Sequence, residues 1–132
     1  MFEAHGSYDL VLRGRILEVN VKGAWNLESA LDYAKSVDKF ITSLSGQPWA
    51  MVSIIDDFEL FTPDCKPVIQ KLSRNAYRNG LVREAMVNFE YGIKIQAFQP
   101  TVKGFPTFKR GFFKTKPEAQ VWLKEQGFEV LE

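Results

Sequence analysis

The first part of the chain alternates between apolar and polar residues with a period of two. Residues 8–14 and 15–22 each place their apolar side chains at every second position. Because successive side chains of a strand point to opposite faces, this period predicts two strands that each bury one face. Gly14 lies between them and supplies the positive φ of a tight turn, so we expect a hairpin.

The spacing then changes to three and four residues, which is typical of a helix with one buried stripe. Asn26 is the expected N-cap, and Gly46 and Pro48 end the helix. Residues 49–55 follow as a nearly continuous apolar run, which predicts a strand covered on both faces. Since a strand, a helix and a strand form a crossover, this strand should lie parallel to its partner. The predicted stripe consists of Leu27, Ala30, Leu31, Ala34, Val37, Ile41 and Leu44.

A second helix is expected to begin at Thr62, with Pro63 at its first helical position, where no N–H donor is needed. Gly80 is the natural residue to end it. Residues 85–89 predict another strand. The inward stripe of the helix consists of Cys65, Val68, Ile69, Leu72 and Ala76.

The last part of the chain predicts an edge strand at 108–113 and a helix at 115–126. Thr115 and Glu118 have the spacing of a capping box. Residues 92–104 fit either a strand or a short helix. The element order β-β-α-β-α-β-(α)-β-α predicts an α/β fold with a mixed five-stranded sheet, in a single domain over residues 1–132.

Composition narrows the class of protein. No apolar stretch approaches the roughly 20 residues needed to span a membrane, and the N-terminal residues lack the pattern of a signal peptide. The lone cysteine, Cys65, cannot form an internal disulfide. We therefore expect a cytoplasmic protein with no membrane span.

The charge is unevenly distributed. Residues 92–124 hold seven Lys or Arg against one acid, interleaved with aromatic residues. This mixture can mark a nucleic-acid surface, but we favour core aromatics with a solvated basic rim, and expect no nucleic-acid partner. Lysines on an edge strand discourage aggregation; the alternative is a docking face for an acidic partner or a second copy. The basic cluster consists of Lys103, Lys109, Arg110, Lys114 and Lys116.

Carboxylates follow the apolar run at Asp56, Asp57, Glu59 and Asp64. They could hold a hard cation such as Mg²⁺, which prefers several oxygens. We favour a polar strand-to-helix junction, because no second ligand set, phosphate-binding Gly-rich loop or partner histidine accompanies them. The sequence therefore predicts no catalytic residue, no metal and no cofactor. If the protein binds a partner or ligand, Asp56, Asp57, Glu59 and Thr62 are the expected contacts.

Four single residues need an interpretation of their own. Thr62 is most simply an N-cap, and it is also the candidate phosphoacceptor. Cys65 falls on the predicted stripe, which favours a buried structural thiol over a nucleophile. His5 is alone in a tail, and we expect it to be solvated. Trp25 either packs on the first turn of the helix or is exposed and marks a binding face.

Three stretches resemble STAS-like domains, a group that includes the bacterial anti-sigma-factor antagonists, and in particular their uncharacterised SpoIIAA-like relatives. They are VNVKGAWNLESALDYAKSVDKFI at 19–41, WAMVSIIDDFELFTPD at 49–64 and FKRGFFKTKPEAQVWLKEQGF at 108–128. The resemblance implies a non-enzymatic module that binds a protein partner through the loop before its second helix and through the start of that helix.

Phosphorylation of a Ser or Thr at this place switches off binding in such antagonists. Here the usual Asp-Ser-Ser-Gly pattern is missing, and Thr62 is the only hydroxyl among Thr62, Pro63, Asp64 and Cys65. The nearby carboxylates would repel an added phosphate. Other relatives have been likened to carriers of small apolar ligands.

We therefore rank three functions in order of preference. The first is a cytoplasmic regulatory or protein-interaction module, the second a carrier of a small apolar or lipid-like ligand, and the third a metal-dependent enzyme that uses the acids of residues 56–64. Self-association into a homodimer is a further expectation, through the last strand and the basic face.

Overall fold

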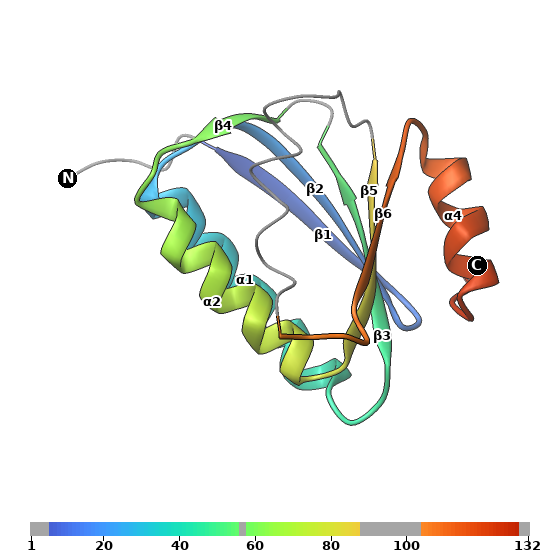
Figure 1. Ribbon diagram of the computed structural model, residues 1–132. Coiled ribbons are helices and arrows are strands. Elements are labelled where there is room, and N and C mark those ends of the chain that lie inside the picture. Colours follow the sequence, from blue (N-terminus) through green and yellow to red (C-terminus); the bar gives the residue numbers. More distant parts are fainter. Residues whose placement is uncertain (1–5, 56–57, 88–103, 130–132) are drawn as a thin grey trace.

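The computed structural model describes residues 6–55, 58–87 and 104–129. Three helices and six strands lie in these ranges (Figure 1). The strands are β1 (Ser7–Arg13), β2 (Ile16–Trp25), β3 (Trp49–Ile54), β4 (Phe58–Phe61), β5 (Leu81–Val87) and β6 (Lys109–Phe113). The helices are α1 (Leu27–Leu44), α2 (Cys65–Arg78) and α4 (Lys116–Glu125).

The strands form a mixed sheet in the order β1-β2-β3-β5-β6. β1 pairs with β2 antiparallel, while β2, β3, β5 and β6 lie parallel to one another. The α1 and α2 helices cover one face of the sheet and α4 covers the other (Figure 1). The predicted α/β fold with a mixed five-stranded sheet, its opening hairpin and its parallel crossover are therefore confirmed.

Alternation along each strand divides the core into two clusters. On β3, Trp49 and Met51 are buried beneath α1 and α2, whereas Ala50 and Val52 are buried beneath α4. A strand covered on both faces has little need for polar residues. The apolar run from residue 49 is thus explained by its position in the middle of the sheet.

The first helix agrees with the prediction except in its stripe. Asn26 caps α1, and its side chain accepts a hydrogen bond from the Ser29 backbone N–H. Leu31, which we expected in the stripe, is 50% exposed, and Tyr33 is buried in its place. Leu31 lies between the buried Ala30 and Tyr33, on the opposite side of the helix from the sheet.

Three further predictions are corrected. The residues after β3 do not all form a loop, because residues 58–61 form β4, which pairs parallel with the end of β2. The α2 helix begins at Cys65 with Asp64 as its N-cap residue, so Thr62 is not the N-cap and Pro63 is not at the first helical position. β5 begins at Leu81, four residues before the predicted start.

The remaining elements follow their patterns. Gly80 follows α2 with φ +102°, and Thr115 caps α4 by accepting a hydrogen bond from the Glu118 N–H. The expected strand or short helix at residues 92–104 falls almost wholly outside the described residues. No helix among the described residues is long and apolar enough to cross a membrane.

Candidate functional site

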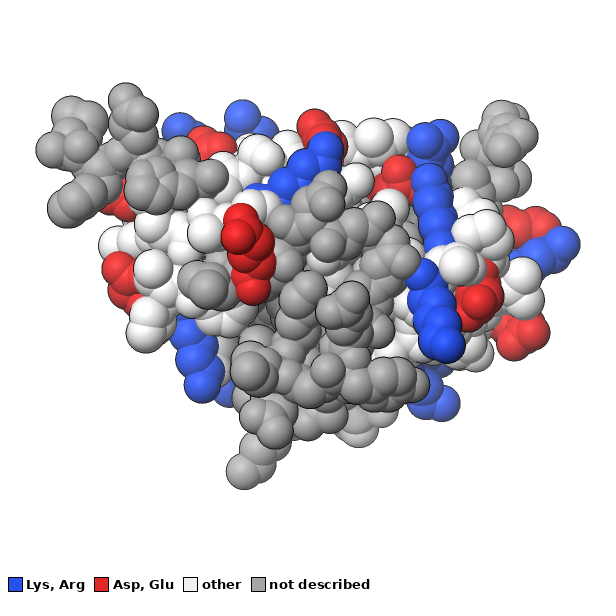
Figure 2. Space-filling model, turned by 90° about the horizontal axis from the view of Figure 1, so that it is seen from above, with Lys and Arg blue, Asp and Glu red and all other residues white. Residues whose placement is uncertain are grey.

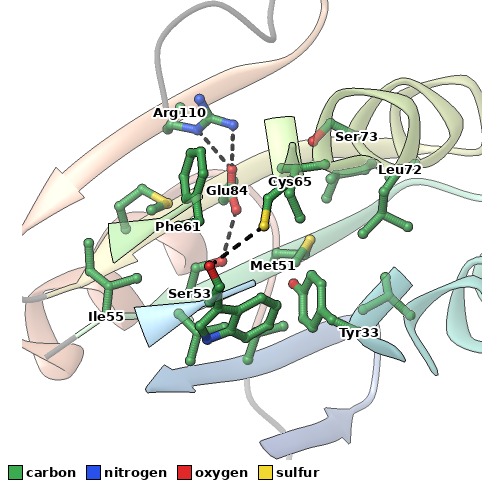
Figure 3. A pocket seen from close by; sticks show the side chains of 18 of the residues that line it. Tyr33, Met51, Ser53, Ile55, Phe61, Cys65, Leu72, Ser73, Glu84 and Arg110 are labelled. Carbon is green, nitrogen blue, oxygen red and sulfur yellow. Dashed lines mark hydrogen bonds and ion pairs between the residues drawn. The ribbon is translucent and has the colours of Figure 1, made fainter. Parts of the chain in front are cut away.

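A pocket of about 110 Å³ lies between the sheet and the two helices α1 and α2 (Figure 3). Its wall is predominantly apolar, and it combines fully buried side chains with half-buried ones. Small-molecule sites are typically concave and apolar with a few placed polar groups. The apolar part of the wall includes Val19, Val37, Met51, Ile55, Leu72 and Met86.

The pocket follows directly from the strand and helix patterns. Met51 and Ser53 are two residues apart on β3, as are Glu84 and Met86 on β5, so each pair points to the same face of the sheet. Tyr33 of α1 also lines the pocket, from the helical side. Three neighbouring elements thus converge on one volume.

A charged network forms one side of the pocket. Glu84 and Arg110 are direct cross-strand neighbours on β5 and β6. The Arg110 Nε donates to Glu84 Oε1 over 2.8 Å, and Nη2 lies 2.7 Å from the same oxygen. The Ser53 hydroxyl donates to Glu84 Oε2 over 2.8 Å, and Arg110 Nη2 donates to the Tyr77 hydroxyl over 3.2 Å. Both carboxylate oxygens of Glu84 are therefore engaged.

The burial of this pair makes each charge depend on the other. The side chains of Arg110 and Glu84 are only 9% and 12% exposed. Burial acts to lower the pKa of Arg110, but the Glu84 carboxylate and Tyr77 outweigh it, so the pKa stays above its ordinary value. Arg110 also lies over the ring of Phe108, 5.3 Å from its centroid. Arg110 was expected on a solvated basic rim, and this expectation is wrong.

Tyr33 is held firmly beside the pocket. Its ring meets those of Trp25 and Tyr8 edge-on, at centroid distances of 5.1 and 5.2 Å. Burial, and then the charge of Glu84, raise the pKa of Tyr33 well above its ordinary value, so its hydroxyl is neutral. Trp25 is itself buried, which confirms the packed interpretation over an exposed binding face.

Cys65 begins α2 and also lines the pocket. It is fully buried, as predicted. Its thiol lies 3.7 Å from the Trp25 carbonyl oxygen, to which it donates, and 3.4 Å from the Thr62 hydroxyl. The thiol thus connects the start of α2 with the end of β2.

Of the predicted contacts that the structure describes, Glu59 and Thr62 do not line the pocket. Asp56, Asp57 and His5 lie outside the described residues. Glu59 is exposed on β4, and the half-buried Thr62 donates a hydrogen bond to the carboxylate of Asp64. Among the residues that the structure describes, no group of three His, Cys, Asp or Glu side chains is placed to hold a metal ion.

Three residues on the polar side of the pocket were not among the predicted site residues. Tyr33 was omitted from the helical stripe, Glu84 fell before the predicted strand, and Arg110 was grouped with surface lysines. A usable signal was present, because Glu84 directly precedes the apolar run Ala85, Met86 and Val87. A charged residue in a central strand usually needs a buried partner.

On the face that Figure 2 shows, the described charged residues are of both signs. Figure 2 shows the end of the molecule at the top of Figure 1, where acidic side chains lie among basic ones. Lys116 pairs with Glu18 at 2.6 Å, across the sheet from the pocket. Lys103 lies outside the described residues. The absence of a nucleic-acid partner remains a prediction.

Comparisons with known proteins bear on the fold. No protein-family model matches the sequence, and no curated protein matches it. A solved structure with a similar architecture is that of an uncharacterised protein of the DUF3478 family, with a SpoIIAA-like fold, from Shewanella loihica PV-4. The TM-score is 0.70 at 13% identity, over 93% of this chain and 97% of that one. A fold does not by itself imply a function, but it confirms the resemblance seen in the sequence: the chain has a SpoIIAA-like α/β fold.

Proposed function

We propose that this chain is a non-enzymatic binding module whose pocket holds a small, largely apolar molecule. The observation that carries the proposal is the pocket between the sheet and helices α1 and α2, with its apolar wall. Sequence analysis ranked a protein-interaction module first and a ligand carrier second. The pocket reverses this order, because it is a concave site already formed by the fold.

The size of the pocket limits the ligand. A dry cavity of about 150 Å³ in another protein binds benzene, and this pocket measures about 110 Å³. A molecule with roughly the volume of one six-membered ring therefore suits it, and a long acyl chain does not. The carrier hypothesis is therefore restricted to compact ligands, and a lipid with a long chain is left out.

The absence of catalysis is part of the proposal. The charged groups of the pocket are already engaged: Glu84 accepts from both Arg110 and Ser53. A general base needs a carboxylate or imidazole that is within reach of the substrate and ready to accept a proton. A carboxylate held by a guanidinium and a hydroxyl is better suited to shaping the wall.

The test is a thermal-unfolding series with benzene and toluene as probes, together with native mass spectrometry of the purified protein. A ligand that binds only the folded state raises Tm, so saturating toluene should raise it by several degrees. Ala76 lines the pocket and is buried, so the Ala76→Leu variant should fill the pocket and lose this response. Leu31→Ala, at an exposed position of α1, is the matched control and should keep it.

An unchanged Tm with every probe, together with a mass spectrum free of any co-purifying molecule, would contradict the proposal. A response that persists undiminished in Ala76→Leu would show that the probes bind elsewhere.

The second candidate function is the regulatory or protein-interaction module. Glu59 favours it, because this exposed carboxylate lies on β4, a short strand that is paired with β2 alone among the described strands. In this proposal β4 and the start of α2 form the docking edge, with Asp56 and Asp57 beside them in the sequence. Control of this docking by phosphorylation of Thr62 has less support, since the Asp64 carboxylate beside the hydroxyl would repel a phosphate.

Charge reversal tests this candidate. A partner captured by the wild-type protein should be lost with Glu59→Lys and kept with Glu125→Lys, which changes an exposed carboxylate on α4 at the other face of the sheet. Equal capture by both variants would contradict docking at β4.

A further inference from the structure

The hydroxyl of Tyr33 has no hydrogen-bond partner among the residues that the structure describes. Tyr33 is 8% exposed, lines the pocket and directs its hydroxyl into it (Figure 3). Arg13 Nε is the one side-chain nitrogen or oxygen among the described residues that is both fully buried and without a hydrogen bond, so the Tyr33 hydroxyl is not sealed off but faces the open volume of the pocket. Most polar groups of buried residues are hydrogen-bonded. The position of this hydroxyl therefore needs an explanation.

Neighbouring aromatic residues show what is usual in this fold. The Tyr8 hydroxyl donates to the Asp32 carboxylate over 2.7 Å, and it lies 2.6 Å from the Ser36 hydroxyl. The indole N–H of Trp25 donates to the Lys22 carbonyl oxygen over 2.9 Å. Each of these polar groups has a partner within the protein, whereas the Tyr33 hydroxyl is aimed at the pocket.

Tyr33 cannot easily turn its hydroxyl away. Its ring makes edge-on contacts with Trp25 at an interplanar angle of 76° and with Tyr8 at 78°. Rotation of a buried ring about its own axis leaves the hydroxyl where it is, and a change of rotamer would break both contacts. The direction of the hydroxyl is thus fixed by the packing of α1 against β1 and β2.

The same surroundings restrict the charge of a ligand. The Glu84 carboxylate is already compensated by Arg110, and an additional ion would enter a largely apolar wall in which the described residues offer no further counter-charge. Bringing an unpaired charge out of water is strongly unfavourable. Because the raised pKa keeps the Tyr33 hydroxyl neutral, it can donate to or accept from a neutral oxygen.

We infer that the pocket binds a neutral, ring-sized molecule that carries one hydroxyl or carbonyl oxygen, and that this oxygen hydrogen-bonds to Tyr33. The inference rests on the proposed binding function and specifies the chemistry of its ligand. The apolar part of the molecule lies against side chains such as Met51 and Val37, and its oxygen replaces the missing partner of the tyrosine hydroxyl.

The experiment compares phenol with toluene, since the two differ by a hydroxyl in place of a methyl group. Calorimetric titration at pH 7 gives the affinity ratio of the two probes for the wild type and for Tyr33→Phe. One neutral hydrogen bond corresponds to a roughly three- to tenfold change in affinity, so the ratio should fall by that factor in Tyr33→Phe. Tyr8→Phe removes a hydroxyl bonded outside the pocket and should leave the ratio unchanged.

Two further measurements make the result decisive. Tyr33→Phe is expected to fold, because it removes a hydroxyl that makes no hydrogen bond to the described part of the protein. Should it fail to fold, the wild type with ¹³C-labelled tyrosine serves instead: phenol should shift the ring carbon that bears the Tyr33 hydroxyl, and toluene should shift it much less. Benzoate, the charged probe of similar size, should bind at least tenfold more weakly than phenol.

The outcomes separate the two claims. If toluene binds but the ratio is the same in wild type and Tyr33→Phe, the role of Tyr33 is wrong while the binding function stands. If benzoate binds more tightly than phenol, the requirement for a neutral ligand is wrong. If neither toluene nor phenol binds, both the inference and the proposed function fail.

Discussion

The two faces of the sheet are built from the same strands but in different ways. Beneath α4, fully buried alanines let the helix approach the sheet closely: Ala50 on β3, Ala85 on β5 and Ala119 on the helix itself. Beneath α1 and α2, the core contains large aromatic rings, together with the buried pair of Glu84 and Arg110. The first face has a fully buried aliphatic centre with half-buried aromatic rings packed against it, whereas the second leaves a pocket.

This difference shows that one strand can pack against α4 with one set of side chains and line the pocket with the other set. Ala50 and Val52 of β3 face α4, while Met51 and Ser53 face the pocket. Since side chains alternate along a strand, the residues that define the pocket can vary without disturbing the packing under α4. A fold shared at 13% identity can thus carry different sites on one face.

The largest expected effect comes from removing one member of the buried ion pair. Glu84→Ala removes the carboxylate that pairs with Arg110 and accepts from Ser53. Breaking a buried pair typically costs about 3–5 kcal/mol. We expect a loss of this size in the free energy of unfolding, measured by urea denaturation at pH 7.

A double variant separates the charge from the packing. Glu84→Leu combined with Arg110→Met replaces both charges by apolar groups of similar length, and such replacements are often neutral or stabilising. The double variant should recover most of the loss caused by Glu84→Ala. A double variant as unstable as the single one would mean that the contacts to Ser53 and Tyr77, and not charge compensation, dominate.

An intermediate effect distinguishes the packed face from the hollow one. Ala119→Leu adds three carbon atoms beneath α4, where Ala119 is fully buried, and overpacking of this kind costs about 1–3 kcal/mol. Ala76→Leu adds the same atoms on α2, where the pocket can accept them. We expect the smaller loss of stability for Ala76→Leu, in parallel urea denaturation of both variants.

Ligand response provides the complementary measurement. Toluene should still raise the Tm of Ala119→Leu, after allowance for its lower starting value, and should not raise that of Ala76→Leu. Equal destabilisation by the two substitutions would contradict the distinction between the faces.

Much of the fold could be predicted because long periodic patterns determine it. The alternation in β1 and β2, the stripe of α1 and the capping residue Thr115 of α4 all depend on local sequence. The start of α2 was harder to predict from the sequence. Thr62, Pro63 and Asp64 form a turn in which the Cys65 N–H donates to the Thr62 carbonyl oxygen, and only the geometry of this turn delays the helix.

The site could be predicted less well, because it depends on contacts between distant residues. Glu84 and Arg110 each resemble a solvated residue when taken alone, and only the register of β5 against β6 makes them partners. Tyr33 is an amphipathic residue whose hydroxyl can face water or the interior. Its direction depends on Trp25 and Tyr8, which come from different strands.

The smallest expected effect is a difference in alkaline stability between the buried and the surface tyrosine hydroxyl. The folded state holds the proton of Tyr33 more tightly than the unfolded state, since burial raises the pKa of Tyr33 above its ordinary value of about 10. Its contribution to stability is complete below pH 10 and falls as the pH rises further, by up to about 1.4 kcal/mol per pH unit. Tyr33→Phe should lose this component, so its free energy of unfolding should fall less steeply between pH 10 and 11 than that of the wild type. Tyr8→Phe should flatten the pH profile of the free energy of unfolding less, because the Tyr8 hydroxyl lies in an exposed hydrogen bond with Asp32. Identical slopes for wild type and Tyr33→Phe would mean that water reaches the Tyr33 hydroxyl freely.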